Sequence, residues 1–122
     1  MTRVEEDKER EDRIDDEVIV DAYGEEERSI GWYYYLAEGI TFPFKAQCIV
    51  ERSISPLKIN EQVEVIDIAS ADDCEHDMLV MIRLMDRTFS VPLSQLNPID
   101  VDDQTQTIIE DWQYWVARGY EF

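Results

Sequence analysis

Apolar residues in the first part of the chain recur at helical spacing. Residues 1–13 are mostly charged, and we expect them to form a flexible acidic lead-in. Beyond them, Ile14 and Val18 open an apolar stripe on one face of a helix. This first helix is expected to end at Gly24, since glycine commonly follows a helix. The folded part is therefore expected to be a single domain over residues 14–122.

A second helix is predicted over residues 25–38. Three consecutive glutamates occupy its first turn, where the helix dipole favours negative charge. Ile30, Tyr33, Tyr34 and Ala37 repeat at intervals of three and four, so we expect them to form the face that packs on the core. The run of three tyrosines within this segment would also suit a strand.

The middle of the chain has the alternation of short β-strands. Val63 and Val65 point to one side of an extended segment, and Glu64 points to the other. A short 3₁₀ turn is expected at residues 94–96, just before the last strand. Five strands are predicted, over residues 44–50, 61–69, 78–85, 88–91 and 99–101. Short strands at this spacing are typical of a small, strongly bent barrel of the SH3 type.

The end of the chain predicts one more helix, over residues 105–118. Its apolar face would hold Ile108, Trp112, Trp115 and Val116. We expect the tryptophans to pack in the core, with an aromatic cage for a basic peptide as the alternative. The predicted fold class is α+β: a small SH3-like β-barrel of about five strands, flanked by two N-terminal helices and one C-terminal helix.

Charge narrows the possible partners. The 122 residues include 29 acidic and 11 basic side chains, a net charge of −18. Such a field repels nucleic acid and anionic lipid, so neither is an expected partner, whereas cations and basic proteins are attracted. No apolar run approaches the roughly 18 residues of a membrane span, and no signal peptide is evident. We therefore expect a cytoplasmic monomer that does not associate with membranes.

Motifs for catalysis and for zinc are weak in this sequence. There is no P-loop, nucleophile elbow or dinucleotide-binding motif, so we expect that the protein is not an enzyme. Cys48, Cys74 and His76 with Asp77 are a zinc candidate, but the chain has no C-x-x-C pair. Two cysteines without framework spacing are expected to be reduced, with at least one buried.

Calcium suits the carboxylates better, because Ca²⁺ takes six to eight oxygens from flexible loops. Asp73, Glu75 and Asp77 alternate like the first ligands of an EF-hand. The match then fails, since Met78 stands where a glycine is needed and Leu84 where a bidentate glutamate is needed. This turn is therefore expected to be a weaker cation site that is not an EF-hand.

The better predicted site joins two helix–barrel junctions. Asp100, Asp102 and Asp103 precede the last helix, and Glu38 ends the second helix beside its free carbonyls. Three carboxylates within four residues repel one another unless they are solvated or bridged by a cation. Folding could bring the two junctions together around Ca²⁺. The alternative is that one of these aspartates caps the last helix.

Several segments resemble a known family. Residues 31–44 (GWYYYLAEGITFPF), 92–100 (PLSQLNPID) and 111–115 (DWQYW) are similar to the cyanobacterial calcium-binding protein CcbP family. The resemblance extends over roughly residues 28–118. It implies a small acidic protein that binds Ca²⁺ without EF-hands, as an intracellular buffer or sensor. The other hypothesis is an acidic SH3-like interaction module that docks a basic partner protein.

Overall fold

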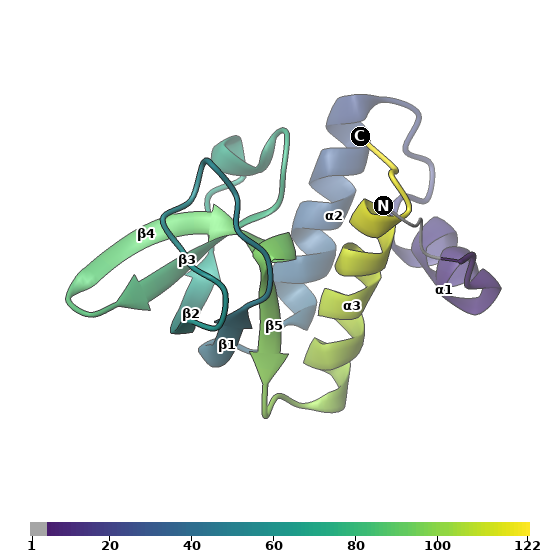
Figure 1. The fold of residues 1–122 in the computed structure, drawn as a ribbon. Helices are drawn as coiled ribbons and strands as arrows, with labels where there is room; N and C mark the ends of the chain where they lie inside the picture. The colour runs from purple at the N-terminus through teal and green to yellow at the C-terminus, as the bar shows by residue number, and fades with distance from the viewer. Residues whose placement is uncertain (1–4) are drawn as a thin grey trace.

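The computed structural model describes residues 5–122, which form helices packed against one side of a five-stranded sheet (Figure 1). The α-helices are α1 (Lys8–Arg13), α2 (Glu25–Gly39) and α3 (Asp103–Ala117), and a π-helical turn, η1 (Ile14–Val18), extends α1. The strands are β1 (Phe44–Cys48), β2 (Gln62–Ile68), β3 (Leu79–Leu84), β4 (Arg87–Pro92) and β5 (Leu96–Ile99). The α+β class, the five strands and the order of the helices are as predicted.

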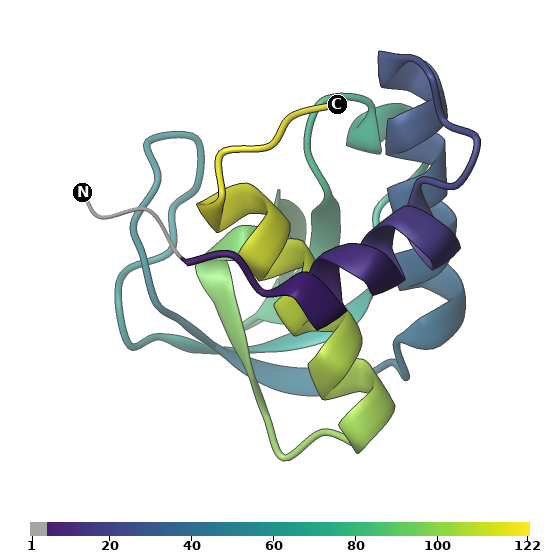
Figure 2. The same cartoon turned by 90° about the vertical axis from the view of Figure 1, so that its right-hand side faces the viewer.

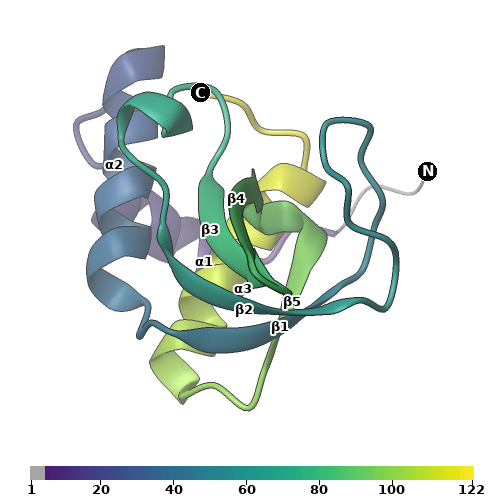
Figure 3. The same ribbon diagram turned by 90° about the vertical axis from the view of Figure 1, so that its left-hand side faces the viewer.

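The sheet is antiparallel throughout, with strand order β4-β3-β2-β1-β5. Its strands curve strongly (Figure 3), and a 3₁₀ turn, η3 (Leu93–Gln95), joins β4 to β5. Within residues 5–122, however, these two edge strands do not pair with each other, so the sheet is not closed and the SH3-like barrel is not confirmed. Val63 and Val65 are buried, in agreement with the predicted alternation.

The last strand lies earlier than the sequence suggests. β5 pairs with β1 from Leu96 to Ile99, whereas the strand was expected over residues 99–101. The shift has a local cause at Asp100, whose φ of 53° is left-handed and turns the chain out of the sheet. The strand therefore ends where the predicted one begins, and the acidic residues that follow form a turn.

The N-terminal helix begins earlier than predicted and ends earlier. Lys8–Arg13, within the expected lead-in, is helical, and the Asp7 carboxylate caps it by accepting a 3.0 Å hydrogen bond from the Arg10 backbone N–H. The helical path stops at Val18, and Asp21 then takes a left-handed φ of 57°. Figure 2 shows this helix lying across α3. Residues 1–4 of the expected lead-in lie outside the described residues.

The second helix has its predicted bounds to within one residue, but a different face is buried. The buried residues are Ser29, Trp32 and Leu36, while Ile30 and Tyr34 are 44% and 55% exposed. The predicted core face was therefore wrong at Ile30 and Tyr34, whereas Tyr33 is partly buried and packs against the core. The cause is the partner of α2: it packs against the tryptophans of α3, and a tryptophan face buries more apolar area than the tyrosine face does.

Three tryptophans join α2 to α3 in the core. The Trp32 ring lies 5.0 Å from that of Trp112 and 5.5 Å from that of Trp115, and all three side chains are buried. They are core residues, as expected, rather than an open aromatic cage. Ile108 is buried beside them, but Val116 is partly exposed, which narrows the predicted apolar face of α3.

The structure also shows the state of the two cysteines and the character of the helices. Cys48 and Cys74 are both buried and both free. Burial raises the pKa of the Cys74 thiol, which keeps it in the less reactive protonated form. Among the helices of residues 5–122, none is long and apolar enough to cross a membrane.

Candidate functional site

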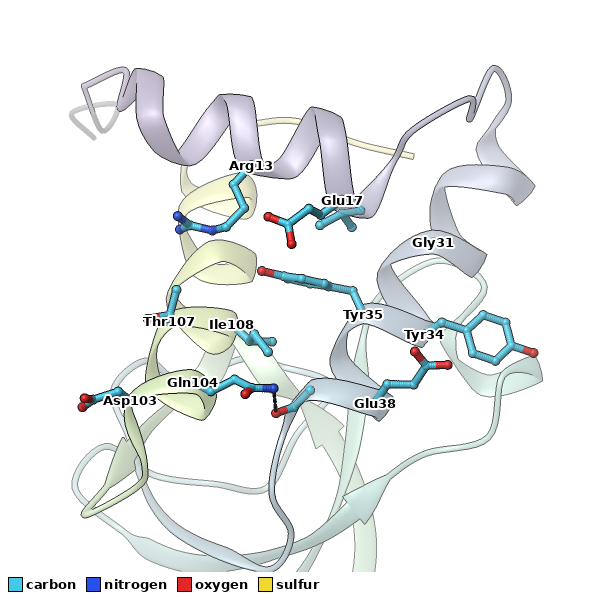
Figure 4. A pocket seen from close by; sticks show the side chains of 12 residues that line it. Arg13, Glu17, Gly31, Tyr34, Tyr35, Glu38, Asp103, Gln104, Thr107 and Ile108 are labelled. Atoms are coloured by element: carbon cyan, nitrogen blue, oxygen red, sulfur yellow. Dashed lines mark hydrogen bonds between the residues drawn. The ribbon is translucent and has the colours of Figure 1, made fainter.

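The end of α2 and the start of α3 lie side by side (Figure 4). The Thr41 backbone N–H donates a 3.0 Å hydrogen bond to Thr105 Oγ1, and Gln104 Nε2 donates one of 3.2 Å to the Gly39 carbonyl. These bonds link residues more than 60 positions apart in the chain. The structure thus brings together the two junctions that the sequence analysis selected.

One of the predicted ligands already has a structural role. Asp102 is the N-cap of α3: its Oδ1 accepts a 2.7 Å hydrogen bond from the Thr105 backbone N–H, and its Oδ2 accepts one of 3.0 Å from Thr105 Oγ1. The backbone bond is the main reason that the pKa of Asp102 lies below its usual value. The alternative that one of these aspartates caps the last helix therefore applies to Asp102.

The other carboxylates at the junction are exposed and have no bonding partner within residues 5–122. Glu38 and Asp103 line a groove of about 700 Å³ between the helices, and Asp103 points away from its centre in Figure 4. Asp100 lies in the left-handed turn after β5. In the described part of the chain, no three His, Cys, Asp or Glu side chains converge as a metal site. The two junctions therefore lie together, but their carboxylate oxygens do not converge on one point.

The residues of the second predicted site, in the β2–β3 turn, face different surroundings. Asp73 belongs to a 3₁₀ turn and is exposed, as is Glu75, which shares a pocket with Glu25 at the start of α2. Asp77 turns inward, 3.8 Å from the Arg52 guanidinium, and burial raises its pKa. The structure therefore separates Asp77 from the two exposed carboxylates of this turn.

The most highly bonded carboxylate in the described chain, Asp111, was not among the predicted site residues. Asp111 is fully buried and accepts hydrogen bonds from Arg10 Nη1 (2.8 Å), Arg13 Nε and Nη2 (3.0 and 2.5 Å) and Tyr35 Oη (2.6 Å). Burial and the bond to Asp111 raise the pKa of Tyr35. A signal was present, because Asp111 lies on the apolar stripe of α3 next to Trp112. This cluster joins three helices and leaves no oxygen free for a metal.

Comparisons with known proteins agree on one family. The model of the CcbP family, described as calcium binding, matches residues 12–116. Two solved structures are similar over 100% of both chains, each with a TM-score of 0.88: Anabaena CcbP, at 44% identity, and a calcium binding protein in its calcium-binding form, at 43%. No curated protein matches the chain. Because the family model covers most of the sequence, the chain belongs to the CcbP calcium-binding family.

Proposed function

We propose that this protein binds Ca²⁺ at the α2–α3 junction, through loop carboxylates and without an EF-hand. The observation that carries the proposal is the pair of hydrogen bonds that hold the end of α2 against the start of α3. They hold the segment that follows Glu38 against the first turn of α3, although the bonded residues lie 64 and 65 positions apart in sequence. Membership of a calcium-binding family and likeness to a structure in its calcium-binding form support the same ligand.

The bound ion would draw its oxygens from three exposed side chains. Glu38, Asp100 and Asp103 have no partner among residues 5–122, so they can turn toward an ion without breaking a bond. Asp102 would not ligate the ion, because both of its oxygens accept hydrogen bonds in the helix cap, but its negative charge would still attract the ion. Ca²⁺ accepts irregular arrangements of six to eight oxygens, with water and carbonyls completing the shell, whereas Mg²⁺ demands a near-ideal octahedron. The proposed preference is therefore for Ca²⁺.

A weaker site is proposed in the turn between β2 and β3, with Asp73, Glu75 and Asp77. Its support is the spacing of the three carboxylates and the neighbouring Glu25 of α2. Binding there would have to displace Arg52 from Asp77, which argues for lower affinity than at the junction. From the charge and composition of the chain, we propose that the protein acts in the cytoplasm as a monomeric Ca²⁺ buffer or sensor.

Calorimetric titration of the chelator-treated protein with Ca²⁺ and, separately, with Mg²⁺ tests the proposal. We expect Ca²⁺ to bind more tightly, and Asp100→Asn or Glu38→Gln to weaken its tighter binding phase by at least about tenfold, because each removes a charged ligand. Glu9→Gln, on the exposed face of α1, is the matched control and should not change affinity. Absence of heat at millimolar Ca²⁺, or equal binding by all variants, would contradict the junction site.

The second candidate function is an SH3-like interaction module that docks a basic protein. Its support is the net charge of −18, which attracts basic surfaces. Asp100→Asn with Asp102→Asn separates the two hypotheses. Under the calcium hypothesis, this double substitution should remove Ca²⁺ binding at the junction. Under the interaction hypothesis, it should only slow association with the basic protein slightly, since rim charges act mainly on the association rate.

A further inference from the structure

A groove of about 700 Å³ runs between η1, α2 and α3, within the size range of small-molecule sites (Figure 4). Its lining includes apolar side chains from two elements, Val18 of η1 and Ile108 of α3. Tyr34 and Tyr35 add aromatic surface from α2. Val18 and Ile108 are each only 5% exposed, so the surface that the groove offers a ligand is mainly aromatic.

Two carboxylates mark separate parts of this groove. In Figure 4, Glu17 reaches in from η1 toward Tyr35, and Glu38 lies farther along α2, below Tyr34. Neither glutamate has an ion pair or hydrogen bond to another residue among 5–122. The one basic residue of the lining, Arg13, donates two hydrogen bonds to Asp111, and Asp111 together with Asp7 balances the charges of Arg13 and Arg10. The charges of Glu17 and Glu38 are thus uncompensated, and the third carboxylate of the lining, Asp103, points away from the centre of the groove (Figure 4).

We propose that this groove binds a linear polyamine, with one ammonium group at Glu17 and another at Glu38. The methylene chain between the two cations would lie on the rings of the exposed Tyr34 and the half-buried Tyr35, which lose water-exposed apolar surface when covered. Tyr34, one helical turn before Glu38, can face an ammonium group with its ring, a favourable cation–π arrangement. A metal ion fits this part of the groove less well, because these two carboxylates come from different elements and do not converge.

The polyamine site goes beyond the proposed calcium site and can be tested separately from it. Glu38 belongs to both proposals, so Ca²⁺ and a polyamine are expected to compete there. Glu17 belongs to the polyamine site alone, and Asp100 to the calcium site alone. Each proposal therefore has a residue whose substitution leaves the other unaffected.

Calorimetric titration with spermidine, in buffer of about 0.15 M KCl to screen nonspecific attraction, tests the inference. We expect Glu17→Gln and Glu38→Gln each to weaken spermidine binding about fivefold, the effect of losing one partly exposed ion pair. n-Butylamine, with a single ammonium group, should bind more weakly than spermidine. Glu17→Gln should retain the affinity of the wild type for Ca²⁺, and Asp100→Asn should retain its affinity for spermidine.

Glu9→Gln is the control for general charge, because it removes the same charge from an exposed site outside the groove. Equal spermidine affinity in the wild type, the Glu9 variant and a Glu17→Gln/Glu38→Gln double variant would overturn the proposal, since it would show only counterion attraction to an acidic protein. Loss of spermidine binding in the double variant alone would establish the site, whatever the outcome for Ca²⁺.

Discussion

Two glycines allow the helices of this protein to approach one another closely. A Cβ at position 31 would stand 2.3 Å from the Val18 carbonyl oxygen, and one at position 39 would stand 2.1 Å from Ile108 Cδ1. The two neighbours differ in kind, since a backbone carbonyl moves only with its element, while the tip of an isoleucine can change rotamer. The position of Gly31 is therefore the less tolerant of the two.

We predict that Gly31→Ala destabilises the protein by about 1–3 kcal/mol, the usual cost of an added group in a packed site. Alanine is normally about 1 kcal/mol better than glycine inside a helix, so a loss would show that the clash with Val18 outweighs propensity. Urea denaturation measures the free energy of unfolding. Gly24 is the N-cap of α2, and a Cβ there meets only Glu27 Oε1 at 3.7 Å, so Gly24→Ala is the control and should cost less than about 1 kcal/mol, from the capping preference alone. A Gly31→Ala protein as stable as wild type would disprove the close approach.

At the scale of elements, the short N-terminal helix depends on one buried carboxylate of another helix. α1 has no buried residue of its own, and six residues are too few for a helix that is stable alone. Arg10 and Arg13 hold it to Asp111, and Ile14 and Val18 of η1 follow into the core. The cluster thus joins the first helix to α3 across about a hundred residues of sequence.

Asp111→Ala is predicted to cost roughly 3 kcal/mol, because it leaves two guanidinium groups without their buried partner. This cost lies at the lower end of the range for breaking a buried ion pair, because Arg10 and Arg13 are partly exposed and can turn toward water. Hydrogen exchange should show that residues 8–18 lose protection while the sheet keeps it. Asp12→Ala breaks only an exposed pair with Lys8 and should change stability by less than about 1 kcal/mol. Uniform loss of protection would argue against a local role.

The periodicity of the sequence predicted the helices and strands themselves better than it predicted which of their faces are buried. Helix α2 has nearly its predicted bounds, yet its buried stripe follows Trp32 rather than Tyr34. Both stripes have helical spacing, and only the position of α3 chooses between them. The start of α1 was missed for a related reason, because its polar sequence is ordered by bonds to Asp111, far along the chain.

For the molecule as a whole, the candidate site was predictable only in outline. The sequence indicated that two helix–sheet junctions would meet, and the Thr41–Thr105 bond confirms it. It could not choose which aspartate caps α3, because each has the same local chemistry, and backbone geometry assigned that role to Asp102. The groove beside the junction was not foreseen, since its walls come from three elements whose packing no local pattern encodes.

The net charge of −18 leads to the last prediction. Most of these carboxylates lie on the surface, where their mutual repulsion opposes the compact state and salt screens it. With chelator present, raising KCl from about 0.02 to about 0.5 M shortens the screening length from roughly 20 Å to roughly 4 Å. This change should raise the melting temperature by about 5 °C, equivalent to ~1 kcal/mol of stability. The buried Asp111 cluster should be little affected by the salt.

A charge-reduced variant is the control for this salt effect. Glu5→Gln, Glu6→Gln and Glu9→Gln remove three exposed charges without touching the core or the junction, so the variant should melt higher at low salt and gain less from KCl. A melting temperature that falls with salt would show instead that attractive surface pairs, such as Arg83–Glu64 at 3.0 Å, outweigh the repulsion. A further rise on replacing chelator by Ca²⁺ at constant ionic strength would then report specific binding, since screening is already matched.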